Sequence, residues 1–454
     1  MLNQFARGPP PGQLVVMTTP AATQPVPPSP APPDPPAAGT RRSRLLHPDP
    51  VIRRLAWLTL VNAFGNGLFM TVGVLFFTRA LHFSAAGVGL GLTLAGLCGV
   101  LASMPGGRAA DRWGTKPVLM ALVIAEGAGM ACYGLVHSFP VFVLLACLVT
   151  AVDRASSAVR NTLYAQALPK QARVEGRAYL RAVTNVAIGA GASLAALALQ
   201  ADSRQAYVTA ILVDAATFAA VAVMLPSIPI PPAAGRAPAP VAAGTGRAGE
   251  PPRPRSALRD LPFLVVTVLN SVLTLQFGVI EVGMPLWLVQ STHAPRVLVA
   301  PLLIVNTVLV VLLQVRATRG TGELRAAAVA FRRGALLVAA CCLVAATAHG
   351  LAATAACLVL LAAAVLQSLG EVLSQAGGWA LSYALAREEA MGAYQGLFNA
   401  GSAAAMMLGP GLVTVTALDH GLAGWALLAA LFAVAGAAMP FAVRWTERRH
   451  APGV

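Results

Sequence analysis

The sequence predicts an all-α membrane protein in which twelve transmembrane helices form two six-helix halves. Of its 454 residues, 57% are hydrophobic and only 11% are charged, whereas soluble globular proteins carry about a quarter charged residues. The chain contains a series of apolar runs, and the two at 88–104 and 118–136, which hold no Lys or Arg, are each long enough to cross about 30 Å of hydrocarbon as a helix. A Pro-, Gly- and Arg-rich segment at 226–258 separates six of these runs from the other six.

The first segment, 1–50, is rich in Pro, Ala and Thr. A chain of this composition cannot bury a core, so we expect a disordered tail. It has no apolar stretch followed by a small-residue cleavage site, and therefore it does not read as a signal peptide. Met17 is an alternative start to Met1.

Two sets of six spans follow the tail. In the N-terminal half, 51–225, the predicted spans are 55–77, 88–104, 118–136, 141–165, 178–200 and 206–225. The segment 226–258 is predicted to be a flexible cytoplasmic linker. In the C-terminal half, 259–445, the predicted spans are 261–290, 297–315, 334–348, 352–386, 391–417 and 422–443. A cytoplasmic tail, 446–454, ends the sequence.

The basic residues orient these spans. Of the 32 Lys and Arg, all but four fall on one side; Arg79, Arg204 and Arg296 lie in the opposite loops and Arg154 lies within the membrane. The positive-inside rule makes the basic side cytoplasmic, with both termini there. Because the charges are spread through short loops, no nucleic-acid partner is predicted. The Arg- and Ala-rich composition indicates a GC-rich bacterial genome, hence the bacterial cytoplasmic membrane.

The stretch GGRAADRWGTKP, Gly106 to Pro117, joins the second and third spans as a charged cytoplasmic turn. It resembles the signature that major facilitator superfamily transporters carry between spans 2 and 3. The matching positions proposed for a cytoplasmic gate are Gly107, Asp111, Arg112, Gly114 and Lys116. The loop between spans 8 and 9 is basic but lacks the corresponding Asp.

The resemblance implies the major facilitator fold, a monomer, and a central cavity lined by spans 1, 4, 7 and 10. It places Asp111 at the start of span 3, where exposed N–H groups favour an acid. From there Asp111 would engage basic groups or a helix N-terminus of the other half. Rocking of the two halves would then alternate access to a midplane site.

Ionisable residues within the spans are the candidates for chemistry, because a charge at the membrane centre costs about 2.5 to 3.5 kcal/mol. The six are Glu126, Asp153, Arg154, Asp214, Glu281 and Glu371. Four of them lie on spans 4, 7 and 10. Glu126 and Asp214 lie on spans 3 and 6, which the resemblance makes peripheral. We expect these two to be partly exposed near helix ends or to form structural pairs.

Asp153 and Arg154 are neighbours on span 4, so a helix directs them about 100° apart. We therefore expect Arg154 to find its counter-ion elsewhere. Arg154 resembles the membrane-embedded Arg of proton-coupled drug antiporters of this superfamily. Functional coupling and a structural salt bridge both stay open for this residue.

Spans 7, 10 and 1 carry further candidates for the substrate or proton pathway. Glu281 shares a face of span 7 with Asn270 and is the preferred proton or cation site of the outer half. On span 10 a polar and aromatic stripe suits a wet cavity; its members are Gln367, Glu371, Gln375, Trp379 and Tyr383. For the glutamines alone, interhelical hydrogen bonding is favoured. Asn62 and Asn66 on span 1 contact substrate or a neighbouring span, and neither reading is preferred.

These observations predict a secondary active transporter that exports a small drug-like or metabolite compound in exchange for protons. A proton-coupled symporter or a facilitator is the nearest alternative, partly because span 5 lacks the Gly-Pro pair of many antiporters. A non-transporting sensor or structural membrane protein is the second alternative. Enzyme motifs such as HExxH, GxSxG and the Walker loop are absent from the sequence. The expected partners are the lipid bilayer, a small-molecule substrate and protons, with no cofactor or metal.

Overall fold

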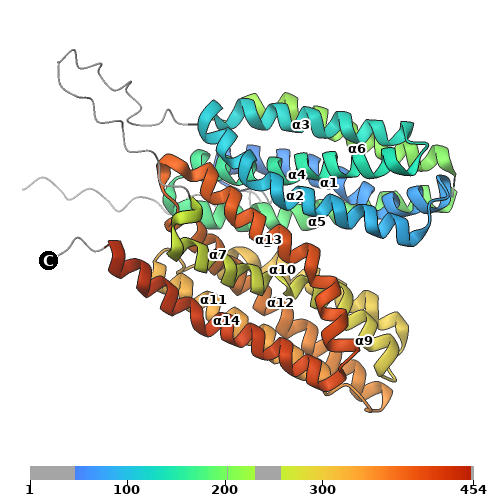
Figure 1. Cartoon of the computed structure of the whole chain (residues 1–454). Helices are drawn as coiled ribbons and strands as arrows, with labels where there is room; N and C mark the ends of the chain where they lie inside the picture. The colour runs from blue at the N-terminus through green and yellow to red at the C-terminus, as the bar shows by residue number, and fades with distance from the viewer. Residues whose placement is uncertain (1–46, 202, 231–256, 451–454) are drawn as a thin grey trace, which may run out of the picture. The chain divides into compact units, whose positions relative to one another are not determined.

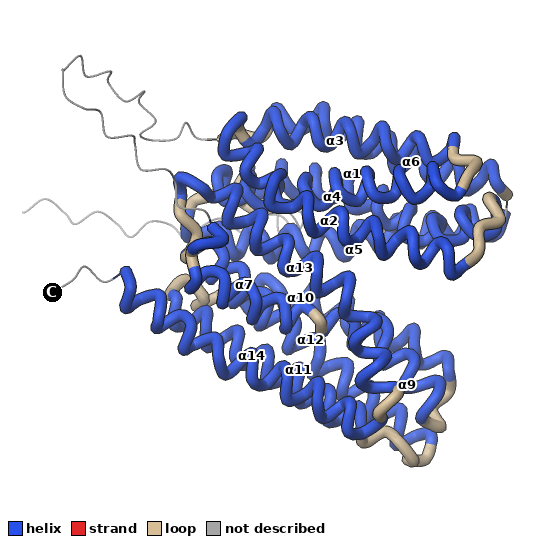
Figure 2. The backbone as a smooth tube through the Cα atoms, viewed as in Figure 1, coloured by secondary structure: helices blue, strands red, loops and turns tan. Residues whose placement is uncertain are grey.

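The computed structural model describes residues 47–201, 203–230 and 257–450, and every regular element in these ranges is a helix. Twelve of the helices in this described part are long and apolar enough to cross a membrane, which confirms the predicted fold class. Figures 1 and 2 show them lying side by side as long rods. Most of the predicted tail and linker lies outside the described residues, as do 451–454.

Six helices precede the linker. They are α1 (Pro50–Leu75), α2 (Ala85–Trp113), α3 (Thr115–Cys132), α4 (Phe139–Ala167), α5 (Arg173–Ala201) and α6 (Arg204–Met224). Their starts follow local chemistry: the Asp49 carboxylate accepts hydrogen bonds from two N–H groups of the first turn of α1, and Ser84 and Ser203 cap α2 and α6 in the same way. Gly114, at φ 93°, is the single residue between α2 and α3.

The elements after the linker form the other six spans. They are α7 (Leu261–Thr274), α8 (Gln276–Gly278), α9 (Met284–Ser291), α10 (Val299–Ala317), α11 (Leu324–Ala346), α12 (Ala353–Ala384), α13 (Met391–Val413) and α14 (Gly421–His450). The first three make one interrupted span, in which the π-helical turn Val279–Gly283 joins α8 to α9. Two further π-helical turns, Phe76–Ala80 and Thr414–Leu418, end α1 and α13.

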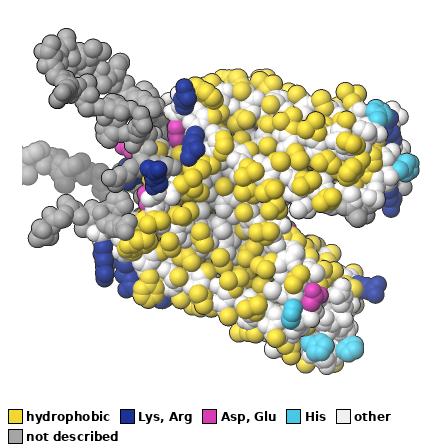
Figure 3. Space-filling model, viewed as in Figure 1, with side chains coloured by type: hydrophobic (Ala, Val, Ile, Leu, Met, Phe, Trp, Pro, Cys, Tyr) yellow, Lys and Arg dark blue, Asp and Glu magenta, His cyan; other side chains and the backbone are white. Residues whose placement is uncertain are grey.

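Each set of six helices has its own hydrophobic core. The buried residues of one core run from Ile52 to Ile228 and those of the other from Val266 to Val443. The two sets, here called the N-half and the C-half, meet where α2 packs against α13 and α5 against α10. Apolar side chains also cover the flanks in Figure 3, as lipid contact requires. We call the end of the bundle where α2 ends and α13 begins the Asp111 end.

Two predicted boundaries were wrong, and in both cases charge was mistaken for a loop. The ninth span starts at Leu324 and not at 334, because residues 324–333 are good helix formers without Gly or Pro. The charged turn after span 2 is also helical as far as Trp113. Asp111 therefore lies in the last turn of α2 and not at the start of span 3.

Glycine sets the distance between α1 and α5. A Cβ atom at Gly191 would collide with the backbone carbonyl oxygen of Phe64, whereas at Gly189 no described atom lies within 4 Å. We expect Gly191→Val to push the helices apart and lower stability by about 1 to 3 kcal/mol, the usual cost of overpacking. The thermal midpoint of the purified protein measures this, with Gly189→Val as the matched control. Equal thermal midpoints for the two variants would show that α1 and α5 are not in close contact at Gly191.

Candidate functional site

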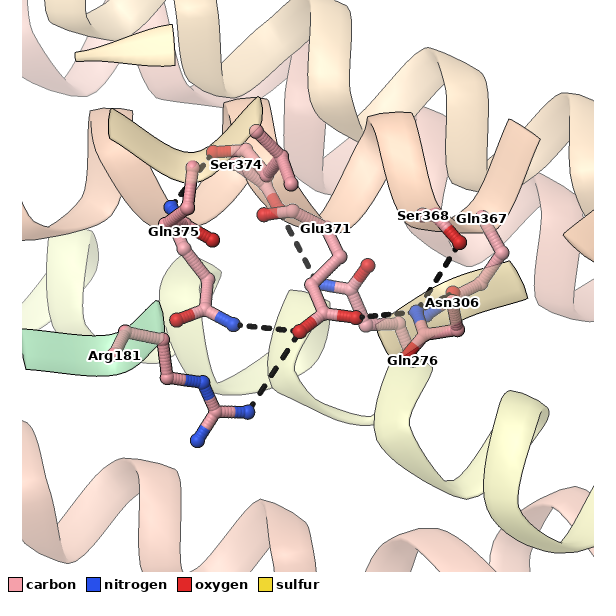
Figure 4. A network of polar contacts seen from close by, with 10 residues as sticks. Arg181, Gln276, Asn306, Gln367, Ser368, Glu371, Ser374 and Gln375 are labelled. Atoms are coloured by element: carbon pink, nitrogen blue, oxygen red, sulfur yellow. Dashed lines mark hydrogen bonds and ion pairs between the residues drawn. The ribbon is translucent and has the colours of Figure 1, made fainter. Parts of the chain in front are cut away.

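A network of polar side chains joins the two halves near the middle of the helices, and we call it the Glu371 network (Figure 4). Glu371 on α12 has a side chain that is only 2% exposed. Its Oε1 atom lies 3.7 Å from Arg181 Nη2 of α5 and accepts a hydrogen bond from Gln375 at 3.1 Å. Its Oε2 atom accepts from Asn306 of α10 at 3.0 Å. Both carboxylate oxygens are thus occupied, and the only cation among these partners belongs to the N-half.

The rest of the network holds the α12 stripe against its neighbours. The Asn306 amide also donates to Gln367 Oε1 at 2.9 Å and lies 3.2 Å from Ser368 Oγ. Gln276 of α8 donates to Ser374 at 3.2 Å. Of the stripe that was expected to suit a wet cavity, Gln367 is fully buried and Trp379 is 8% exposed, whereas Gln375 is half-buried. Hydrogen bonding between helices explains this burial.

Arginines of α5 also face aromatic rings of the C-half. The Arg177 guanidinium lies 5.0 Å from the centre of the Trp379 ring and donates to the Tyr383 hydroxyl at 2.9 Å. Arg181 lies 5.6 Å from the centre of the Phe277 ring. These distances are those of cation–π contacts. Helix α5 therefore presents two cations to α12 and to the seventh span.

Glu281 and Asn270, the other candidates of the seventh span, are placed separately. The Asn270 amide lies 3.5 Å from Ser402 Oγ on α13. Glu281 is exposed on the π-helical turn and interacts electrostatically with Arg181 and Glu371. The interruption of the span removes the regular period on which their shared face was predicted.

A second contact between the halves closes the Asp111 end. The Asp111 carboxylate accepts hydrogen bonds from the N–H groups of Gly392 and Ala393, each at 2.8 Å. These groups belong to the first turn of α13, where unpaired N–H groups and the helix dipole favour an anion. Gly107 crosses Gly392 so closely that a Cβ atom at either position would strike the backbone of the other.

The remaining residues of the gate motif stay within the N-half. Arg112 is exposed and lies over the Trp113 ring, and the Lys116 ammonium lies 3.4 Å from the Pro226 carbonyl oxygen. Lys170 adds an exposed ion pair to Glu388 of the C-half, at 2.6 Å. The Asp111 end is therefore held together by backbone contact, a capped helix and surface charge.

Asn399 on α13 joins the C-half to α2 and α4. Its amide nitrogen lies 3.3 Å from Ser103 Oγ and 3.2 Å from the Arg154 carbonyl oxygen, and its side-chain oxygen accepts from Ser157 at 3.3 Å. Nothing in the spacing of α13 singled out this residue in the sequence.

One expectation for the N-half was wrong. Arg154 pairs with its own neighbour Asp153, Nε to Oδ2 at 3.4 Å, because a long side chain can reach sideways along the helix. For Glu126 and Asp214, of the two alternatives, partial exposure does not apply, because their residues are 3% and 0% exposed. Asn62 bonds the Arg160 guanidinium, while Asn66 is half-buried one turn further along α1.

Sequence reasoning also missed the cations that meet the acids. Arg154 was taken as the only cation within the membrane, yet Arg160 and Arg181 face the interior of the bundle. For Arg181 a signal existed, since it lies inside the predicted span 178–200. Asn306 is an isolated amide in an apolar helix, and a search for polar residues within spans would have found it.

Comparison with known proteins identifies the family. The family described as Major Facilitator Superfamily matches residues 55–410, well over half of the chain. The chain belongs to the major facilitator superfamily. Members of this superfamily are transporters. A separate comparison with curated protein sequences gave no significant match.

Solved structures have the same fold at low sequence identity. The human organic anion transporter MFSD10 (TETRAN) gives a TM-score of 0.65 at 16% identity, covering 86% of this chain and 100% of that one. A bacterial homologue of the iron transporter ferroportin, outward-facing with soaked iron, gives 0.67 at 13%, covering 87% and 99%. The E. coli fucose:proton symporter FucP gives 0.62 at 14%, covering 87% and 98%. At these identities the likeness to this major facilitator chain extends to the fold alone.

Proposed function

We propose that this major facilitator protein exports a small drug-like or metabolite compound from a bacterial cell in exchange for protons. The observation that carries the proposal is the ion pair between Arg181 of the N-half and the buried Glu371 of the C-half. Protonation of Glu371 removes the negative charge that attracts Arg181. The charge state of one side chain thereby changes the attraction between two halves that must move relative to each other.

The two ends of the bundle support alternating access. The contacts of Asp111, Gly107 and Lys170 join the halves at the Asp111 end. In Figure 3 the surface is hollowed between the halves at the other end. Lys and Arg gather around the Asp111 end in the same view. If that end faces the cytoplasm, as the positive-inside rule predicts, this arrangement is open to the outside.

The class of substrate rests on the groups beside the Glu371 network. The rings of Trp379, Tyr383 and Phe277, of which the first two are buried in the state described here, lie next to the cations Arg177 and Arg181, so a substrate would reach them only when the halves separate. An amphipathic compound matches this combination. The names of the similar structures span an organic anion, iron and fucose, so the fold itself does not choose among substrates.

The first step is to find a compound to test. Metabolite and drug accumulation is compared between cells with and without the gene, and a compound that differs is chosen. That compound is then followed in proteoliposomes with an imposed pH gradient. We expect Glu371→Gln to lower gradient-driven flux at least tenfold while substrate exchange without a gradient continues, because a glutamine cannot release a proton. Glu281→Gln is expected to weaken the gradient response, and exposed Glu389→Gln is the control.

Each other outcome has a defined meaning. Intact gradient-driven flux in both Glu371→Gln and Glu281→Gln would refute the proton role. Flux in the same direction as the protons would make the protein a symporter. Absence of flux for every compound that accumulates differently would favour a sensor or structural protein.

A further inference from the structure

Three carboxyl groups of the N-half meet inside the bundle, away from Glu371. Glu126 comes from α3, Asp153 from α4 and Asp214 from α6. Glu126 is 3% exposed and lies close enough to Asp153 and Asp214 to interact with both, and Asp214 also interacts electrostatically with Asp153. We call these three residues the acid triad. The exchange mechanism proposed above uses none of them.

The hydrogen bonding of the acid triad is incomplete without a further ligand. Among the described residues, Glu126 Oε2 has no hydrogen-bond partner, and the only group beside the Asp214 carboxylate that could donate one is the Thr217 hydroxyl, which donates to the Asp214 backbone carbonyl. Buried carboxylates in this condition are strongly disfavoured. Two ionised carboxylates close together in a buried site also repel each other and cannot donate a hydrogen bond to each other, so one proton shared between Glu126 and Asp153 relieves the repulsion.

The charges of the residues around the acid triad also indicate one bound proton. Arg154 pairs with Asp153, and Arg160, bonded to Asn62 of α1 and Ser156, interacts electrostatically with Glu126. The other elements packed here contribute uncharged groups: Gly65 of α1 beside Asp214, Thr217 of α6, Gly99 of α2 and Asn399 of α13 beside Arg154. Two arginines face three acids, and one bound proton makes the set neutral.

We propose that Glu126, Asp153 and Asp214 form a second proton-binding site, which holds one proton in the state described here. The Asp153 side chain is 32% exposed and is the point of entry. A hydronium ion there gives up a proton, an O–H bond forms on the Asp153 carboxylate, and water remains. The proton is then shared with Glu126, and the nearby Asp214 carboxylate favours its retention by electrostatic attraction. No electrons are transferred.

Infrared difference spectroscopy of the purified full-length protein in lipid nanodiscs tests the site without any transport substrate. The probe is the proton itself, varied by pH, and the signal is the carbonyl band of protonated carboxyl groups. We expect wild-type protein at neutral pH to show such a band. Glu126→Gln and Asp214→Asn should each lose or shift it, whereas the exposed control Glu389→Gln should not.

The proposal is overturned if the band is absent from wild type or is unchanged in both variants. It is also overturned if Na⁺ in place of a pH change alters the band, since the ligand would then be a metal cation. If one variant fails to fold, as size-exclusion chromatography shows, the other decides. Glu371→Gln should keep the triad band, so the result is independent of the coupling role proposed for Glu371.

Discussion

Replacement of Gly107 by valine is expected to lower transport at least tenfold while the protein still reaches the membrane in normal amounts. A Cβ atom at this position would overlap the backbone carbonyl of Gly392, and backbone cannot rotate away as a side chain can. The Asp111 end could then close only by moving α2 away from α13. The hydrogen bonds from α13 to Asp111 would lengthen and the closed state would lose population.

Gly89→Val on the same helix is the matched control, because no described atom lies within 4 Å of a Cβ atom there. Initial rates in proteoliposomes, normalised to the amount of reconstituted protein, measure the difference. Unimpaired transport by Gly107→Val would show that the two glycines need not touch during the cycle.

Replacement of Arg181 by methionine is expected to cause the largest loss of transport, on the order of a hundredfold. It removes the cation from a carboxylate that is 2% exposed and otherwise has only amide partners. Leaving a buried charge without its counter-ion costs about 3 to 5 kcal/mol, unless the group takes up a proton. In either case the charge-dependent attraction between the halves is lost. Arg181→Lys keeps the charge and should retain part of the activity.

The control for this variant is Arg325→Met. Arg325 pairs with Glu447 at 3.2 Å, but its side chain is 78% exposed and both partners lie in the C-half. Exposed pairs contribute about 0.2 to 1 kcal/mol, so transport should hardly change. A cycle of Arg181→Met, Glu371→Gln and the double variant then isolates the interaction. If the losses simply add, the two side chains act independently and the proposed coupling is wrong.

The sequence was sufficient for the spans because burial in lipid requires long apolar helices, whatever the details of packing. It failed at 324–333, where charge resembled a loop but helix propensity decided the structure. It located Glu371 because an acid in an apolar run is conspicuous. It missed Arg181 as a partner because the pairing of α5 with α12 is a property of the tertiary fold, and basic residues near a helix end were all assigned to the cytoplasm.

The acids of the N-half show the same limit from another side. Glu126 and Asp214 were ranked low because spans 3 and 6 are peripheral in the family to which the sequence was compared. A peripheral helix still has one face toward the interior of its own half, and both acids lie on that face. Span number alone therefore cannot rank buried charges.

The three π-helical turns have a consequence for how the two ends open. Phe76–Ala80, Val279–Gly283 and Thr414–Leu418 all follow the part of their span that starts at the Asp111 end, so they lie toward the opposite end. A widened turn loosens the regular hydrogen-bond ladder and allows a helix to bend there. The close contact of Gly107 with Gly392, in contrast, joins α2 and α13 where both are regular α-helices. We therefore expect the end opposite the Asp111 end to close by bending within these three spans, and the Asp111 end to open only when the two halves turn as whole units.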